Sequence, residues 1–301
     1  MAQLELLDAH QSQVGGLPIR RALPHPGRRR VGAWCFLDHA GPAHLHPPGM
    51  RVGPHPHTGL QTFSWLIEGE ILHRDSLGSE QVLRPGQVNL MTAGRGICHS
   101  EESLSDRLQL AQLWIALPES QRHCAPAFEH FPRLPQWSDG GFHLTLLVGS
   151  LDSAHEGHQQ SPVPSHTPLL GVDLACSAAS RLMLPLTRSH EHGLMVLEGE
   201  LEIQVDGQEE RLQPGRLLYV PVGAKQLLIR SEGRARLLLL GGEPLDEQIL
   251  LWWNFVGRTQ DEIRQWSEQW NAGTGPFGAV HGYEGERLLA PDASALKMRA
   301  S

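Results

Sequence analysis

Four residues in the first half of the chain could hold a metal ion. His55 and His57 are two residues apart, and so are His99 and Glu101. Side chains of a β-strand alternate between its two faces, so the members of each pair point the same way if both pairs lie in strands. Three imidazoles and one carboxylate suit Fe, Mn, Ni, Cu or Zn better than Mg or Ca, which prefer oxygen ligands. The spacing therefore predicts one site for a divalent transition metal.

Other residues near these pairs are weaker candidates. His44 and His46 are also two residues apart, but two prolines follow them and no strand pattern does, which indicates a loop with solvated histidines. Cys98 is adjacent to His99 and therefore has the opposite strand parity. We expect it to pack in the core.

The stretch between the two pairs has the pattern of a β-meander. Apolar and β-branched runs at residues 62–67, 71–73, 81–83 and 88–91 are separated by glycine and proline. The whole chain has 40% hydrophobic and 19% charged residues, with 32 Gly and 22 Pro, which favours an all-β globular protein. Such a meander can bring the two ends of the stretch together inside a small barrel.

The second half of the chain repeats landmarks of the first half. The Glu-Gly-Glu motif at 68–70 recurs at 198–200, and the Leu-x-Pro-Gly motif at 83–86 recurs at 212–215, at offsets of 130 and 129 residues. The repeat predicts two tandem barrels. An offset of 129 assigns these residues to the four ligand positions: Leu184, Leu186, Leu228 and Arg230. We therefore expect the second barrel to lack the metal.

His190 and His192 restore a His-x-His spacing in the second half, but no partner pair follows them. They are expected to lie on the surface.

These patterns predict a domain layout. Residues 1–120 would form the metal-binding barrel, residues 121–140 a proline-rich linker, and residues 141–301 the second barrel. The first 30 residues are expected to be irregular. A helix is expected near residues 260–271, because Thr259 and Glu262 have the spacing of a capping box.

Charge and composition exclude several classes of partner. The formal net charge is -8, so direct nucleic-acid binding is not expected. No apolar run has the length of a membrane span, and residues 1–13 lack the pattern of a secretion signal. The four cysteines show no Cys-x-x-Cys spacing, which favours free thiols in a reducing compartment. We expect a soluble cytoplasmic protein.

Several segments together resemble the pirin family. They are residues 53–57, 68–70, 73–78, 91–101, 112–118 and 252–256. The resemblance implies a bicupin, with two tandem cupin (jelly-roll) barrels and a short C-terminal helix. It also implies one metal in the N-terminal barrel, usually iron, held by His55, His57, His99 and Glu101. The wider cupin superfamily has a glutamate near position 61, where this chain has Gln61, but pirins take their carboxylate from the later pair.

The family resemblance implies two kinds of role. The first is a quercetin 2,3-dioxygenase-type enzyme that uses O2 to open the central ring of a flavonol-like substrate and releases carbon monoxide. Glu101 would accept the proton of the flavonol 3-hydroxyl as the catalytic base. The alternative is a redox-sensitive regulatory module that binds a transcription factor or a metabolic enzyme. A purely structural metal ranks third, because structural zinc sites are more often built from cysteine.

Overall fold

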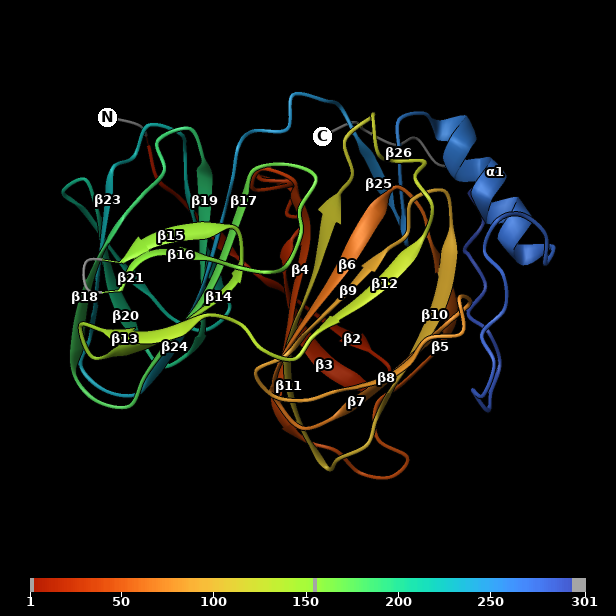
Figure 1. Ribbon diagram of the computed structural model, residues 1–301, viewed down its shortest axis with the longest axis horizontal. Coiled ribbons are helices and arrows are strands. Elements are labelled where there is room, and N and C mark those ends of the chain that lie inside the picture. The colour runs from red at the N-terminus through yellow and green to blue at the C-terminus, as the bar shows by residue number, and fades with distance from the viewer. Residues whose placement is uncertain (1–2, 154–155, 294–301) are drawn as a thin grey trace. The chain divides into compact units, whose positions relative to one another are not determined.

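The computed structural model describes residues 3–153 and 156–293, and the chain in it divides into two compact units (Figure 1). Unit 1 comprises the chain up to Gln11, Arg20–His39 and Arg133–Leu245. Unit 2 comprises Ser12–Ile19, Ala40–Pro132 and the chain from Asp246. This division differs from the expected ranges 1–120 and 141–301, whose ends at residues 1 and 301 lie outside the described residues.

Unit 2 contains the predicted metal-binding barrel. Its four-stranded sheet has the order β5 (Arg51–His57), β10 (Ile97–Ser103), β7 (Ile71–Asp75), β8 (Glu80–Leu83). The facing seven-stranded sheet has the order β12 (Ala127–Phe131), β9 (Val88–Thr92), β6 (Leu60–Glu68), β11 (Arg107–Ala116), β4 (Trp34–His44), β3 (Leu17–Leu23), β2 (His10–Val14). Parts of β3 and β4 are counted with unit 1.

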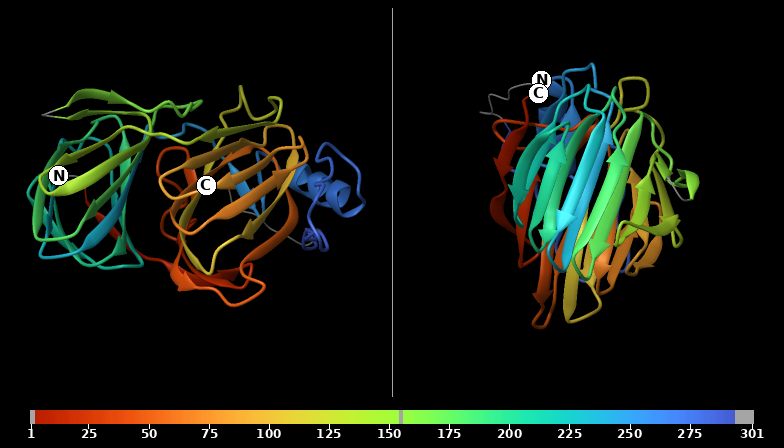
Figure 2. Two further views of the ribbon diagram at one scale, coloured as in Figure 1. Left: turned by 60° about the horizontal axis from the view of Figure 1, so that its bottom comes forward. Right: turned by 90° about the vertical axis from the view of Figure 1, so that its left-hand side faces the viewer.

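Unit 1 repeats this arrangement. Its four-stranded sheet has the order β18 (Ser180–Pro185), β23 (Gln226–Ser231), β20 (Leu201–Val205), β21 (Gln208–Leu212). Its seven-stranded sheet has the order β1 (Glu5–Asp8), β22 (Arg216–Val220), β19 (Glu191–Glu198), β24 (Ala235–Gly242), β17 (Leu169–Cys176), β14 (Phe142–Val148), β13 (Gln136–Asp139), and it fills the right-hand view of Figure 2. A separate hairpin joins β15 (Ser150–Ser153) to β16 (Gly157–Gln160).

The strand orders confirm the predicted duplication. The order β5-β10-β7-β8 in unit 2 corresponds to β18-β23-β20-β21 in unit 1, and β9-β6-β11-β4 corresponds to β22-β19-β24-β17. Neighbouring strands of both four-stranded sheets pair antiparallel, and so do β9 with β6, β6 with β11, β22 with β19, β19 with β24 and β24 with β17. The all-β prediction with two tandem barrels therefore holds.

Two segments expected to be irregular contain strands. Residues 121–140 contain β12, which pairs with β9, and β13, which pairs with β14. The first 30 residues contain β1, β2 and β3, so the expectation of irregular structure there is wrong. All four of β1, β2, β12 and β13 are end strands of their sheets. An end strand needs backbone pairing on one side only, so its sequence need not show a strong apolar pattern.

The C-terminal segment of unit 2 contains the predicted helix. Helix α1 spans Gln260–Asn271 and begins with the capping box of Thr259 and Glu262 (Figure 1). Ile263 and Trp270 on its buried face join an aromatic cluster with Phe255, which lies in β26 (Phe255–Gly257) of the hairpin with β25 (Leu250–Trp252). No helix among the described residues is long and apolar enough to cross a membrane.

The interior of unit 1 is apolar where unit 2 has its histidines. Leu184 of β18 pairs with Leu227 of β23, as His55 pairs with His99, and both leucines belong to the core. The expected equivalents Leu228 and Arg230 are therefore each displaced by one residue. The reason is that Leu212 and Leu227 are 15 positions apart, whereas Leu83 and His99 are 16 positions apart, so the segment between the turn motif and the ligand position is one residue shorter in unit 1.

The prediction that His190 and His192 lie on the surface is wrong. His190 is 8% exposed and His192 is fully buried. His192 has the same strand parity as Leu194 and Val196, which belong to the core of unit 1. Its side chain therefore points into that barrel.

Candidate metal centre

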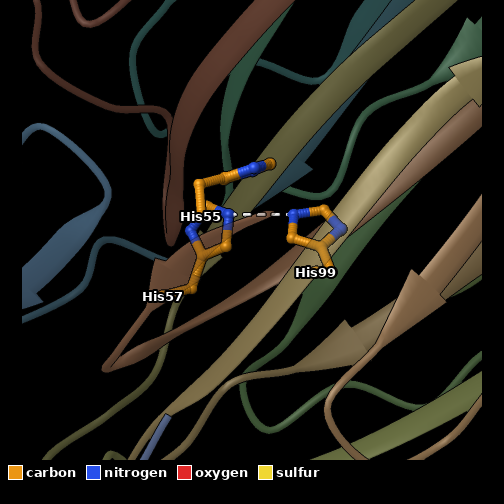
Figure 3. Close-up of side chains that lie close together, drawn as sticks. All are labelled: His55, His57 and His99. Atoms are coloured by element: carbon orange, nitrogen blue, oxygen red, sulfur yellow. Dashed lines mark hydrogen bonds between the residues drawn. The ribbon is translucent and has the colours of Figure 1, made fainter. Parts of the chain in front are cut away.

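Two neighbouring strands supply the predicted ligands. His55 and His57 lie in β5, and His99 and Glu101 lie in β10, which runs antiparallel to β5 with His99 opposite His55. The three histidines are 7%, 1% and 2% exposed, respectively. Their rings face one another inside the barrel, as the strand parity predicted (Figure 3).

The three imidazoles are close enough to share one ion. The Nε2 atoms of His57 and His99 are 3.1 Å apart, and one donor atom from each of the three rings lies within 4.8 Å of the others (Figure 3). Two nitrogens that each lie about 2.1 Å from the same ion are separated by about 3.0–3.4 Å. The separation of the two Nε2 atoms fits that range.

Backbone carbonyls orient two of the rings. His55 Nδ1 lies 2.9 Å from the Gly53 oxygen, and His57 Nδ1 lies 3.2 Å from the Asn254 oxygen. A carbonyl oxygen can only accept a hydrogen bond, so each Nδ1 carries the proton and each Nε2 keeps its lone pair. Metal-binding histidines are commonly held in this way by a partner at the other ring nitrogen.

Burial keeps the imidazoles neutral. It lowers the pKa of His55 to about 4, and it lowers the pKa values of His57 and His99 well below the usual value. The neighbouring imidazoles also lower the pKa values of His57 and His99, because a second positive charge close to the first is unfavourable. Neutral imidazole is the form that binds a metal.

Glu101 lies beside this group but has a different immediate neighbour. A β-bulge between His99 and Glu101 shifts the pairing of β10 with β5 at this point. Glu101 is half-buried and forms a second potential metal-binding group with His73 and His99, again with the donor atoms within 4.8 Å of one another. Burial raises the pKa of Glu101, and the nearby His73 and a hydrogen bond from Ser64 only partly offset this effect.

His73 is the residue that the sequence reasoning missed. It lies in β7 directly opposite Glu101 of β10, is 3% exposed, and has its Nε2 atom 3.1 Å from an Asp75 carboxylate oxygen. Burial opposes ionisation of Asp75, but hydrogen bonds from His73 and Ser79 hold its pKa below the usual value. The His-x-Asp spacing indicates only that His73 and Asp75 share a face of one strand, and not that His73 lies opposite Glu101.

Aromatic side chains contact two of the buried histidines. Trp114 of β11 meets His57 edge-on with ring centroids 5.1 Å apart, and Phe128 of β12 stacks on His73 at 4.4 Å. Cys98 packs in the aromatic cluster around Phe255, on the side of β10 opposite to His99, and burial raises its pKa to about 11. The expected packing role of Cys98 is confirmed.

Comparison with known proteins identifies the family. The pirin family model matches residues 16–115, and the model for the pirin C-terminal cupin domain matches residues 171–276. The chain belongs to the pirin family. Its two barrels are therefore the tandem cupin domains of a pirin, as the resemblance implied.

Three proteins are particularly similar to this pirin. A Pseudomonas aeruginosa protein provisionally named quercetin 2,3-dioxygenase is 50% identical, over 96% of this chain and 90% of its own. A pirin-like protein of Caulobacter vibrioides is 36% identical, over 89% of this chain and 93% of its own. A crystal structure of quercetin 2,3-dioxygenase from Acinetobacter baumannii is 44% identical, covers 99% of this chain and 97% of that one, and has a TM-score of 0.91.

Proposed function

We propose that this pirin is a metal-dependent dioxygenase of the quercetin 2,3-dioxygenase type that acts on flavonol-like aromatic substrates. One observation carries the proposal. Three buried imidazoles, at least two of which keep their Nε2 lone pair, lie close together, and aromatic rings contact His57 and the adjacent His73. Two relatives with names of this enzyme class are 50% and 44% identical to this pirin over nearly its whole length, and this supports the assignment.

The donor set fits a divalent transition metal. The proposed ligands are His55, His57, His99 and Glu101, and Fe(II) is the proposed ion, with Mn, Ni, Cu and Zn also compatible with these donors. Bound there, the cation would supply a Lewis acid and, in the case of iron, a redox-active centre for reaction with O2.

Glu101 is proposed to be the base that takes the proton of the flavonol 3-hydroxyl. Its pKa is raised by burial, so its carboxylate has a greater tendency to take up a proton than an exposed glutamate. The transfer would leave a substrate oxyanion and a neutral Glu101 carboxyl group.

Trp114 and Phe128 are proposed to contact a substrate bound beside the histidines. Their rings already contact the edges or faces of His57 and His73, so they exclude water from the imidazoles. Flat aromatic rings suit a flat aromatic substrate, and the nearby histidines and Glu101 would then set the orientation of that substrate.

Oxygen consumption together with carbon monoxide release tests this function. Iron-reconstituted protein given quercetin should consume O2 and release carbon monoxide. His57→Ala should lose both metal and turnover, whereas Glu101→Gln should lower turnover by about 10²–10⁴-fold, the usual contribution of a general base. His44→Ala is the matched control, because His44 is exposed at the end of β4. Wild-type protein with iron bound but no O2 uptake would contradict the proposal.

A further inference from the structure

His99 presents both of its ring nitrogens to other imidazoles. Its Nε2 atom lies 3.1 Å from His57 Nε2, and its Nδ1 atom lies 3.4 Å from His73 Nδ1. The group of donor atoms therefore continues past His99 to His73 and Glu101.

Asp75 fixes the orientation of His73 through the ring nitrogen Nε2. Asp75 places one carboxylate oxygen 3.1 Å from His73 Nε2, and its other oxygen accepts hydrogen bonds from the backbone N–H groups of Leu77 at 2.9 Å and Ser79 at 3.0 Å. An ionised carboxylate can only accept, so His73 Nε2 carries the proton and Nδ1 keeps a lone pair. Phe128 stacks on the ring with an interplanar angle of 14° and limits its rotation.

Counting protons then leaves one contact unexplained. His57 Nε2 and His73 Nδ1 both direct lone pairs at His99, because their other nitrogens donate to Asn254 and Asp75. A neutral imidazole has one N–H, so His99 can donate to only one of these two neighbours. At the other contact two nitrogen lone pairs face and repel each other. A cation bound between the two nitrogens would remove this repulsion.

The carboxylate of Glu101 completes the second group of donors. His73 lies directly opposite Glu101 in the β7–β10 pairing, and the donor atoms of His73, His99 and Glu101 all lie within 4.8 Å of one another. The 3.4 Å between His99 Nδ1 and His73 Nδ1 equals the separation expected for two nitrogens on one tetrahedral ion at about 2.1 Å. A carboxylate behind a histidine, as in Asp75 behind His73, is the usual support of a metal-binding imidazole.

We propose that His73 is a further metal-binding residue, and that His73, His99 and Glu101 form a second position for the ion beside the one formed by His55, His57 and His99. Asp75 is the positioning residue that orients His73. This inference rests on the proposed metal site, but it does not require the proposed reaction.

Cobalt(II) binding by the full-length protein tests the inference, since the visible spectrum of cobalt reports its ligands. His73→Gln should weaken cobalt binding by about 10–100-fold and change the visible absorption bands, and Asp75→Asn should weaken binding in the same direction. His130→Gln is the matched control. His130 lies in β12 of the same unit, has its Nδ1 atom 2.7 Å from the Asn89 side chain, and belongs to neither potential metal-binding group.

Wild-type affinity together with a wild-type spectrum in His73→Gln would overturn the proposal. Thermal unfolding of the metal-free variants checks that they are folded. If His73→Gln does not fold, Asp75→Asn still tests the proposal. The readout needs neither O2 nor a flavonol. A protein that binds cobalt through His73 but oxidises no flavonol would therefore contradict only the dioxygenase assignment.

Discussion

His192 is a buried polar side chain that does not match its surroundings. It points into the leucine-rich core of unit 1, and neither of its ring nitrogens has a hydrogen-bond partner among the described residues. Burial, together with the neighbouring His190, lowers its pKa to about 4. A buried donor or acceptor without a partner costs about 1–3 kcal/mol, so this residue should destabilise unit 1.

Replacing His192 by leucine should stabilise the protein, and more so in acid. The pKa of His192 is lower in the folded chain than its usual value of 6.5, so the unfolded chain binds more protons between pH 6.5 and about 4. Wild-type stability should fall as the pH drops through this window, by about 2 kcal/mol at pH 5 from this residue alone. Urea unfolding of His192→Leu at pH 7.5 and pH 5 measures the difference. Exposed His143 of β14 supplies the control substitution, and an equal acid sensitivity of His192→Leu and wild type would contradict the pKa assignment.

Strand parity accounts for what the sequence could and could not predict about the candidate centre. It placed His55, His57 and His99 on converging faces, because the spacing of two residues survives in any strand. It missed His73, because only the pairing of β7 with β10 brings that residue beside Glu101. A pairing between distant strands is a property of the whole sheet and is not visible in a local spacing.

The hairpin of β25 and β26 supports the candidate metal centre from outside its barrel strands. The Asn254 oxygen in the turn of this hairpin accepts a hydrogen bond from His57. The Val256 carbonyl oxygen packs closely against Gly59, which lies between β5 and β6. Gly59 has a φ of +69°, and a Cβ atom there would lie 2.0 Å from the Val256 oxygen. The hairpin and β5 can therefore keep their contact only with glycine at this position.

Gly59→Ala should disturb both stability and metal binding. The added methyl group must push the hairpin away, which should cost about 2–4 kcal/mol and move the carbonyl that orients His57. Gly86→Ala is the matched control, since Gly86 also has a positive φ of +80° but has open space around the added Cβ atom and lies in the turn between β8 and β9. It should cost only about 1 kcal/mol and leave metal affinity unchanged. Chemical unfolding and metal titration of both variants provide the measurement, and equal metal affinities would show that the hairpin does not orient His57.

On the scale of the whole molecule, the repeat was visible in sequence and the division of the chain was not. Turn motifs recur because each barrel needs the same glycines at the same turns, for example Gly69 and Gly199, both with positive φ. The N-terminal strand β1 joins β22 of unit 1, although about 200 residues separate them. Only the exposed edge of β22 selects that partner, and the edge exists only once the sheet has formed.

Chelation should affect the two units differently. The proposed metal binds only groups of unit 2, and a ligand that binds the folded state stabilises it by about 2.7 kcal/mol at 100 times its Kd. For a unit of this size the corresponding loss on chelation is about 5–10 °C in Tm.

Tryptophan fluorescence can assign the unit that responds. Of the eight tryptophans, Trp34 and Trp137 lie in unit 1 and the other six lie in unit 2, so fluorescence reports mainly on unit 2. We expect the Tm detected by fluorescence to fall on chelation. In calorimetry, the heat absorption from the leucine-rich core of unit 1 should stay at the same temperature. Unfolding in which all the heat absorption shifts together would mean that the two cores unfold as one cooperative unit, and the metal would then stabilise the whole chain.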